Sequence, residues 1–149
     1  MQILYKEPIN IIYFTGVIFC TSLSDYDMVL EEDPQMNRMV ESMELFKMIG
    51  KNRWLSRKQL ILFMNKSDLL KKKISCSPLT SWFPGYDGPN TYDGAVEHFQ
   101  KSFIQLRNKE DTKVFVHLTC AVDKVCMQLV FDIISDIIIT SNQRECSML

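Results

Sequence analysis

Neither sign of charge dominates this sequence: 17 lysines and arginines stand against 18 aspartates and glutamates over 149 residues. Proteins that bind nucleic acid through its phosphates carry a basic excess, so this balance gives no indication of a nucleic-acid partner. The sequence also lacks a pattern of paired cysteines. The five cysteines are odd in number and show no CxxC spacing. Their pattern argues against a disulfide framework and against a structural zinc site, and it favours a reducing compartment.

Long apolar runs are missing as well. No stretch reaches the roughly 18 residues that a membrane span needs. The first 24 residues have neither the basic start nor the small-residue cleavage site of a signal peptide. Hydrophobic residues nevertheless make up 46% of the chain, which is enough to bury the core of one domain of this length. We expect a single soluble domain that could associate with a membrane surface.

Apolar patterning predicts the secondary structure. Leu60 to Met64 form an apolar run without alternation, which predicts a strand buried on both faces of a parallel sheet. Residues 17–23 and 114–118 are two further strand candidates. Apolar residues spaced by three and four predict helices over 34–49, 92–106 and 126–138, the first of them capped by Asp33 and Pro34. Strands and helices in this order indicate an α/β fold with a parallel sheet.

Polar chemistry begins abruptly where the central strand ends, at Asn65, Lys66 and Asp68. Open α/β sheets bind their ligands at this end of their strands. The order Asn-Lys-Ser-Asp matches the N-K-x-D element with which P-loop GTPases read guanine. An ionised aspartate can accept from the two neighbouring N–H donors of guanine, and the lysine stem can cover the base. The alternative interpretation is a polar turn in which Asp68 caps the following helix.

A second element follows the next strand, where Thr119, Cys120 and Ala121 occupy the position at which such GTPases contact the guanine carbonyl through a backbone N–H. Longer matches flank both elements: Ile18-Phe19-Cys20, Leu23-Ser24-Asp25-Tyr26-Asp27, Asn37-Arg38-Met39, Ser77-Pro78-Leu79-Thr80, Asp111-Thr112-Lys113 and Val130-Phe131-Asp132. Through these residues the chain resembles the α subunit of heterotrimeric G proteins, and within that family the inhibitory/transducin-like class.

The resemblance implies a fold and a ligand. It implies a partial P-loop GTPase-like (Ras-like) domain over residues 15–149, with a three-stranded parallel sheet and flanking helices, after an unmatched segment, 1–14. The implied ligand is GTP or GDP, and the implied guanine contacts are Asn65, Lys66, Asp68, Thr119, Cys120 and Ala121.

The resemblance also implies a G-protein-coupled receptor as partner, contacted through the final helix and tail at Ile138, Arg144, Cys146, Met148 and Leu149. Cys146 is fourth from the end, where inhibitory-class α subunits are ADP-ribosylated by pertussis toxin. A cysteine at this distance from a terminal leucine also fits a prenylation pattern, although serine is a poor residue at its first aliphatic position. The implied location is cytoplasmic, at the inner face of the plasma membrane.

Several elements of that family do not appear in the sequence. None of the five glycines opens a G-x-x-x-x-G-K-[ST] phosphate loop, and there is no D-x-x-G-Q element. The catalytic arginine, the inserted helical domain and the amino-terminal βγ-binding helix are also missing, and Met1-Gln2 removes the glycine that myristoylation requires. We therefore expect no magnesium site, no catalytic residue and no hydrolysis, and the case for βγ binding is weak.

The sequence is compatible with two functions. The chain could be a guanine nucleotide-binding α subunit that transduces receptor signals, or a non-catalytic receptor-binding or non-functional truncated product. Two charge-assisted hydrogen bonds from Asp68 give roughly 3 to 6 kcal/mol, against an association cost of about 4 to 15 kcal/mol. Base recognition alone therefore predicts weak binding, in the millimolar range or weaker. Two local features predict marginal stability: an exposed apolar edge at 17–23 and Gly94 in the first turn of a helix.

Overall fold

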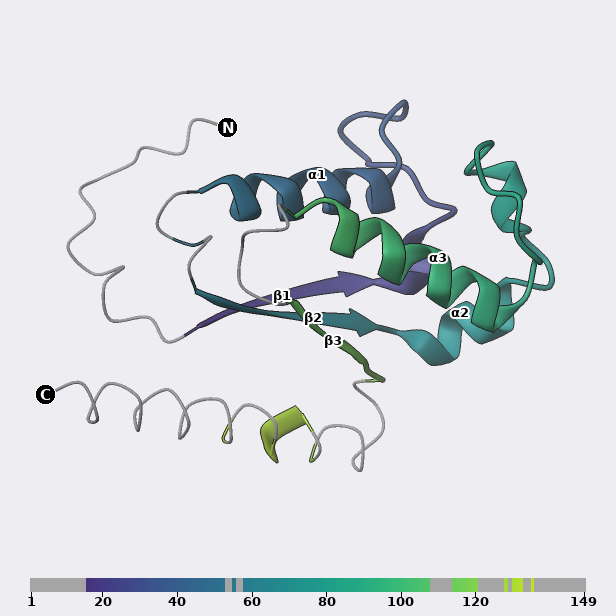
Figure 1. Cartoon of the computed structure of the whole chain (residues 1–149). Helices are drawn as coiled ribbons and strands as arrows, with labels where there is room; N and C mark the ends of the chain where they lie inside the picture. The colour runs from purple at the N-terminus through teal and green to yellow at the C-terminus, as the bar shows by residue number, and fades with distance from the viewer. Residues whose placement is uncertain are drawn as a thin grey trace, which may run out of the picture.

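The computed structural model describes residues 16–52, 55, 58–107, 114–120, 128, 130–132 and 135. The chain forms β1 (Gly16–Ser22), α1 (Arg38–Lys51), β2 (Gln59–Asn65), α2 (Ser67–Lys73), α3 (Tyr92–Gln105) and β3 (Val114–Leu118), with short 3₁₀ helices η2 (Leu23–Asp25) and η3 (Leu79–Ser81). The strands make one sheet in the order β1-β2-β3, and both pairs are parallel. The predicted three-stranded parallel sheet with flanking helices is confirmed (Figure 1).

Strand β2 is central, and both of its faces are covered. Leu60, Leu62 and Met64 belong to the main core, which lies between the sheet and the helices α1 and α3. Ile61 and Phe63 point to the opposite face and cluster there with Val130. A strand covered on both faces is apolar at every position, which explains the unbroken run in the sequence.

Three aromatic rings hold the helices to the sheet. Phe46 of α1 and Phe103 of α3 are fully buried and meet edge to face, with 5.2 Å between ring centroids. Phe19 of β1 meets Phe46 in the same geometry, also at 5.2 Å. Each such pair contributes about 0.5 to 1.5 kcal/mol beyond the buried area. The edge strand β1 is therefore tied firmly to the helical layer on one of its faces.

Helix α1 begins later than the sequence predicts. The predicted start at Asp33 and Pro34 is wrong, because the helix begins at residue 38 with Asn37 as its N-cap. The Asn37 Oδ1 accepts from two backbone N–H groups of the first turn, at 2.8 and 3.2 Å. Its Nδ2 donates to the Tyr26 carbonyl at 2.7 Å, so the cap is also anchored to the loop after β1. Asp33 instead accepts from a backbone N–H in a separate turn.

The connection between α2 and α3 is ordered by tyrosine hydroxyl groups. Tyr26 donates to the Ser77 carbonyl, and Tyr86 donates to the Pro89 carbonyl at 2.7 Å. A Cβ built on Gly94, in the first turn of α3, would stand 2.6 Å from the Tyr86 hydroxyl and 2.6 Å from the Pro89 carbonyl oxygen. Glycine at this position therefore makes room for the loop, which offsets its low helix propensity.

The face of the sheet opposite α1 and the edge at β1 are less completely covered by described residues. Within the described residues β1 pairs only with β2, and Ile18 on β1 is 50% exposed. Residues 128, 130–132 and 135 are helical, and the rest of the predicted helix 126–138 lies outside the described residues. No helix in the described part of the chain is both long and apolar enough to cross a membrane.

Candidate functional site

Two polar turns lie side by side at the carboxyl end of the sheet, because β2 and β3 are parallel neighbours. The Thr119 N–H donates to the Met64 carbonyl at 2.9 Å, and the Ser67 N–H donates to the Thr119 carbonyl at 3.3 Å. These two backbone hydrogen bonds fix the turn at 65–68 against the segment that follows β3. The N-K-x-D element and the second predicted element thus form one structural unit.

The turn after β2 depends on an unusual backbone conformation at Lys66. Its φ of 57° and ψ of 37° are left-handed, and no other described non-glycine residue has a positive φ. This conformation costs a side-chain-bearing residue roughly 1 to 2 kcal/mol. The Asn65 Oδ1 accepts from the Lys66 N–H at 2.8 Å and stabilises the turn. Strained residues of this kind cluster at ligand sites.

Asp68 lies in the first turn of α2 and not at its cap, which is Lys66. The alternative prediction, in which Asp68 is the capping residue, is therefore wrong. A hydrogen bond from the Cys120 thiol lowers the pKa of Asp68 below its usual value; burial opposes this effect, and backbone N–H groups at the start of the helix add to it. An ionised carboxylate only accepts hydrogen bonds, so Asp68 presents an acceptor to any ligand at this edge.

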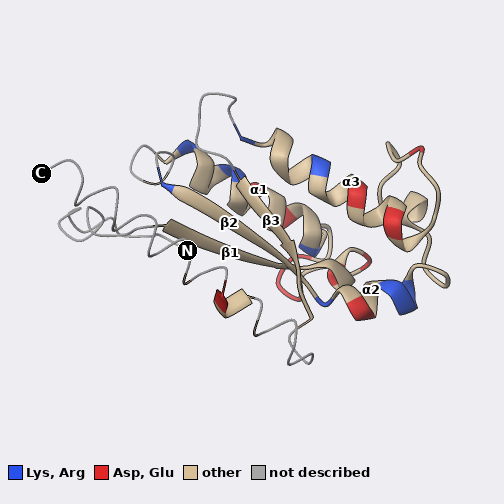
Figure 2. Cartoon of the chain, turned by 60° about the horizontal axis from the view of Figure 1, so that its bottom comes forward, with Lys and Arg blue, Asp and Glu red and all other residues tan. Residues whose placement is uncertain are grey.

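The three strands carry no Asp, Glu, Lys or Arg, and charged residues follow β1 and β2 where these strands end (Figure 2). The Lys66 Nζ lies 3.5 Å from Asp25 Oδ1, and the Arg38 guanidinium lies 3.5 Å from Asp25 Oδ2. The Ser22 hydroxyl donates to the same carboxylate at 2.7 Å. Burial would raise the pKa of Asp25, but the hydroxyl groups of Ser22 and Ser24 and the two cations outweigh it and hold the pKa below its usual value.

Asp25 is not among the residues predicted for the site. Its position in the sequence is the only signal: Asp25 follows β1 as Lys66 follows β2, at the same end of a parallel sheet. The ion pair with Lys66 makes it part of the candidate site, since it fixes the end of a side chain whose stem begins in the turn after β2.

The structure thus brings together five of the six predicted guanine contacts: Asn65, Lys66, Asp68, Thr119 and Cys120. Ala121 lies outside the described residues, as do the predicted receptor contacts Ile138, Arg144, Cys146, Met148 and Leu149. Among the described residues, no three His, Cys, Asp or Glu side chains are grouped as a metal site would require. The arrangement combines an acceptor-only carboxylate, an amide and a long cationic stem, and it suits a flat polar base.

Comparison with known families places this geometry in context. The sequence matches a family model described as G-protein alpha subunit over residues 11–138. The matched region includes the whole described sheet and both turns of the candidate site.

Proposed function

Because the chain belongs to the G-protein alpha subunit family, we propose that the turns after β2 and β3 form the guanine-binding site of a receptor-coupled signalling protein. The observation that carries this proposal is the pair of backbone hydrogen bonds that join Thr119 to Met64 and to Ser67, which bring Asp68 beside Cys120. Guanine nucleotide binding is a general property of the family.

The residues present fit the base of GDP or GTP. Guanine offers two adjacent N–H donors, which match the two oxygens of the ionised Asp68 carboxylate. Adenine presents a ring-nitrogen acceptor where guanine has one of these donors, so the carboxylate disfavours it. The Lys66 stem would cover one face of the base with its methylenes, and the Asn65 amide would hold the surrounding turn. The backbone that follows β3 would supply an N–H for the guanine carbonyl.

We further propose that these contacts hold the nucleotide only weakly in this chain. Two charge-assisted hydrogen bonds give roughly 3 to 6 kcal/mol, and association costs about 4 to 15 kcal/mol. The sequence contains no G-x-x-x-x-G-K-[ST] loop whose N–H groups would add phosphate binding. The proposal therefore includes no magnesium site and no hydrolysis.

Within the family, we propose the inhibitory/transducin-like class and a G-protein-coupled receptor as partner. The support is sequence resemblance at 23–27 and 37–39 and in the tail. The proposed receptor contacts are Ile138, Arg144, Cys146, Met148 and Leu149. The proposed place of action is the inner face of the plasma membrane, where such receptors present their cytoplasmic surface. Family members in general also bind βγ subunits.

A titration with GDP and ADP, followed by backbone amide NMR, tests the guanine site. We expect GDP to shift the amide signals of residues 65–68 and 119–120 with a millimolar midpoint, and ADP to leave them unchanged. Asp68→Ala should abolish the shifts. Asp87→Ala, which removes an exposed carboxylate from the loop before α3, should keep them. Equal shifts with ADP, or GDP shifts confined to other regions, would show that the base is not read here.

A further inference from the structure

The imidazole ring of His98, on helix α3, lies among three aromatic rings. Its centroid is 4.9 Å from that of Tyr86, 6.0 Å from that of Phe83 and 5.5 Å from that of Phe99, and each pair meets edge to face. Phe99 belongs to α3 itself. The other two rings come from the loop between η3 and α3, in a segment that runs from residue 83 to residue 89 and is called the 83–89 segment below.

The hydrogen bonds of this segment are largely its own. The Tyr86 N–H donates to the Phe83 carbonyl at 2.9 Å, and the Tyr86 hydroxyl donates to the Pro89 carbonyl at 2.7 Å. Ring contacts join the segment to α3. Phe83 meets Phe99 at 5.4 Å between centroids, and the other two ring pairs both include His98. A change in the state of the His98 ring therefore acts directly on the attachment of the segment to the helix.

Charge on the His98 ring is unfavourable in this position. Burial lowers the pKa of His98 below its usual value, although the Asp87 carboxylate, on the same loop, opposes the effect. Glu97, the neighbouring acid on α3, is paired with Lys101. Burial, with smaller contributions from Glu97 and Asp87, raises the pKa of Tyr86, so its phenol is neutral wherever an imidazole titrates. The rings thus surround a histidine that they accept best in its neutral form.

We propose that His98 makes the 83–89 segment sensitive to acid: the neutral imidazole holds the segment against α3, and protonation of the imidazole releases it. Histidine is the side chain whose charge changes between about pH 5 and pH 8, so the response falls in a range that a cell can reach. Release would return the charged ring to water and free Phe83 and Tyr86 from the helix, while Leu79, which is fully buried, keeps the start of the loop in the core.

The direction of the effect follows from linkage. In the released state the ring is solvated and its pKa is that of an ordinary histidine, about 6.5. The attached state lowers the pKa of His98. Attachment is therefore at full strength above the released-state pKa and weakens as the pH falls through the attached-state pKa.

An NMR titration of the full chain tests this directly. The two histidines of the chain, His98 and His117, give separate imidazole signals, which His117→Gln assigns. The His98 signal should titrate with a midpoint below about 6.5. The Tyr86 amide should follow the same midpoint, and its protection against hydrogen exchange, corrected for the intrinsic effect of pH, should fall severalfold in acid. The amides of β2 should keep their protection over the same range.

Variants separate the charge on His98 from its packing. His98→Phe keeps an aromatic ring but cannot be protonated, so the protection of the Tyr86 amide should no longer depend on pH. Asp87→Asn removes the carboxylate that favours the charged ring, so the pKa of His98 should fall further and release should need stronger acid. His117→Gln is the matched control, because it removes the other histidine, on β3, and should leave the response of the Tyr86 amide unchanged.

Three outcomes would overturn the proposal. A His98 midpoint above about 6.5 would show that Asp87 and the aromatic faces stabilise the charged ring, so that acid tightens the attachment. Protection of the Tyr86 amide that ignores pH would show that the segment does not respond to the titration. An acid response that persists in His98→Phe would assign it to another group. Thermal unfolding checks each variant, and if His98→Phe does not fold, the His98 midpoint in the unmodified chain and its shift in Asp87→Asn decide the question.

Discussion

The ammonium group of Lys66 lies 3.5 Å from the carboxylate of Asp25, so the turn after β2 is tied to the loop after β1. The same carboxylate binds Arg38 at the start of α1. A single acidic side chain therefore connects the proposed base site to the start of helix α1. A substitution of Asp25 should therefore disturb both the turn after β2 and the start of α1.

Acid should weaken the fold through Asp25. The folded chain lowers the pKa of this carboxyl group, so its charge contributes stability that is complete above the unfolded pKa of about 3.9. That contribution is lost as the pH falls through the folded pKa. Urea unfolding near pH 6 and near pH 3 should show a smaller acid-induced loss of unfolding free energy in Asp25→Asn than in the unmodified chain. Glu32→Gln, an exposed loop change, should keep the full loss, and an equal loss in all three proteins would contradict the prediction.

Base preference should follow the hydrogen-bonding pattern of residue 68. Asp68→Asn replaces one carboxylate oxygen with an N–H donor. Guanine would then face a donor with its own amino group, whereas xanthine presents a carbonyl oxygen there. In amide NMR titrations, the variant should lose its response to guanosine and respond to xanthosine. Asn65→Ala should weaken both responses without exchanging them. A variant that still prefers guanosine would show that Asp68 does not contact this edge of the base.

Nucleotide binding and turnover should both be weak. Calorimetry with GTP or GDP should detect no submicromolar binding, because the base contacts, at roughly 3 to 6 kcal/mol, reach only the low end of the association cost of about 4 to 15 kcal/mol. Phosphate release from GTP should stay at the rate of a buffer blank. Tight binding that depends on magnesium would refute the proposed weak site and would establish phosphate contacts elsewhere in the chain.

Gly94→Ala should destabilise the chain, although alanine is the better helix former. Propensity alone predicts a gain of about 1 kcal/mol. The new Cβ would stand 2.6 Å from the Tyr86 hydroxyl, so the loop must shift, and we expect a net loss of about 1 to 3 kcal/mol in urea unfolding. Gly85→Ala is the control, because nothing lies within 4 Å of its built Cβ. It should change the unfolding free energy by less than about 0.5 kcal/mol.

The tail should engage a receptor weakly. A peptide of residues 134–149 should compete with an intact inhibitory-class α subunit for an activated receptor, and Ser147→Gly should strengthen the competition because glycine tolerates the positive φ of a terminal turn. Pertussis toxin should label the chain at Cys146, and Cys146→Ser should remove the label. If neither peptide competes at high micromolar concentration, the receptor-binding proposal fails.

The sequence by itself determined the sheet and the composition of the site. The strand at 60–64 was predictable because a parallel strand covered on both faces leaves a continuous apolar run. Shorter apolar runs indicated the strands at 17–23 and 114–118. The structure gives β3 the same bounds as predicted and extends β2 by one residue at each end. The Asn-Lys-Ser-Asp turn was recognisable because its chemistry is local, with all of its groups within four residues.

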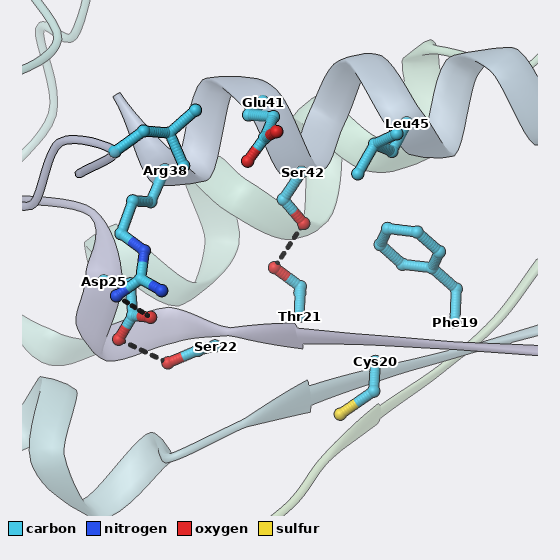
Figure 3. A pocket seen from close by; sticks show the side chains of 10 residues that line it. Phe19, Cys20, Thr21, Ser22, Asp25, Arg38, Glu41, Ser42 and Leu45 are labelled. Carbon is cyan, nitrogen blue, oxygen red and sulfur yellow. Dashed lines mark hydrogen bonds and ion pairs between the residues drawn. The ribbon is translucent and has the colours of Figure 1, made fainter. Parts of the chain in front are cut away.

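Only the tertiary structure decided the features that depend on distant partners. Asn37 displaces Asp33 as the cap of α1 because the Tyr26 carbonyl accepts from its side chain. Gly94 is needed because Tyr86 packs against the first turn of α3. Ser42 of α1 donates to Thr21 of β1 because the helix packs over the strand, which brings together residues 21 positions apart in the chain (Figure 3). Each of these relationships joins residues separated along the chain, and no periodicity or local motif records which residues folding will bring together.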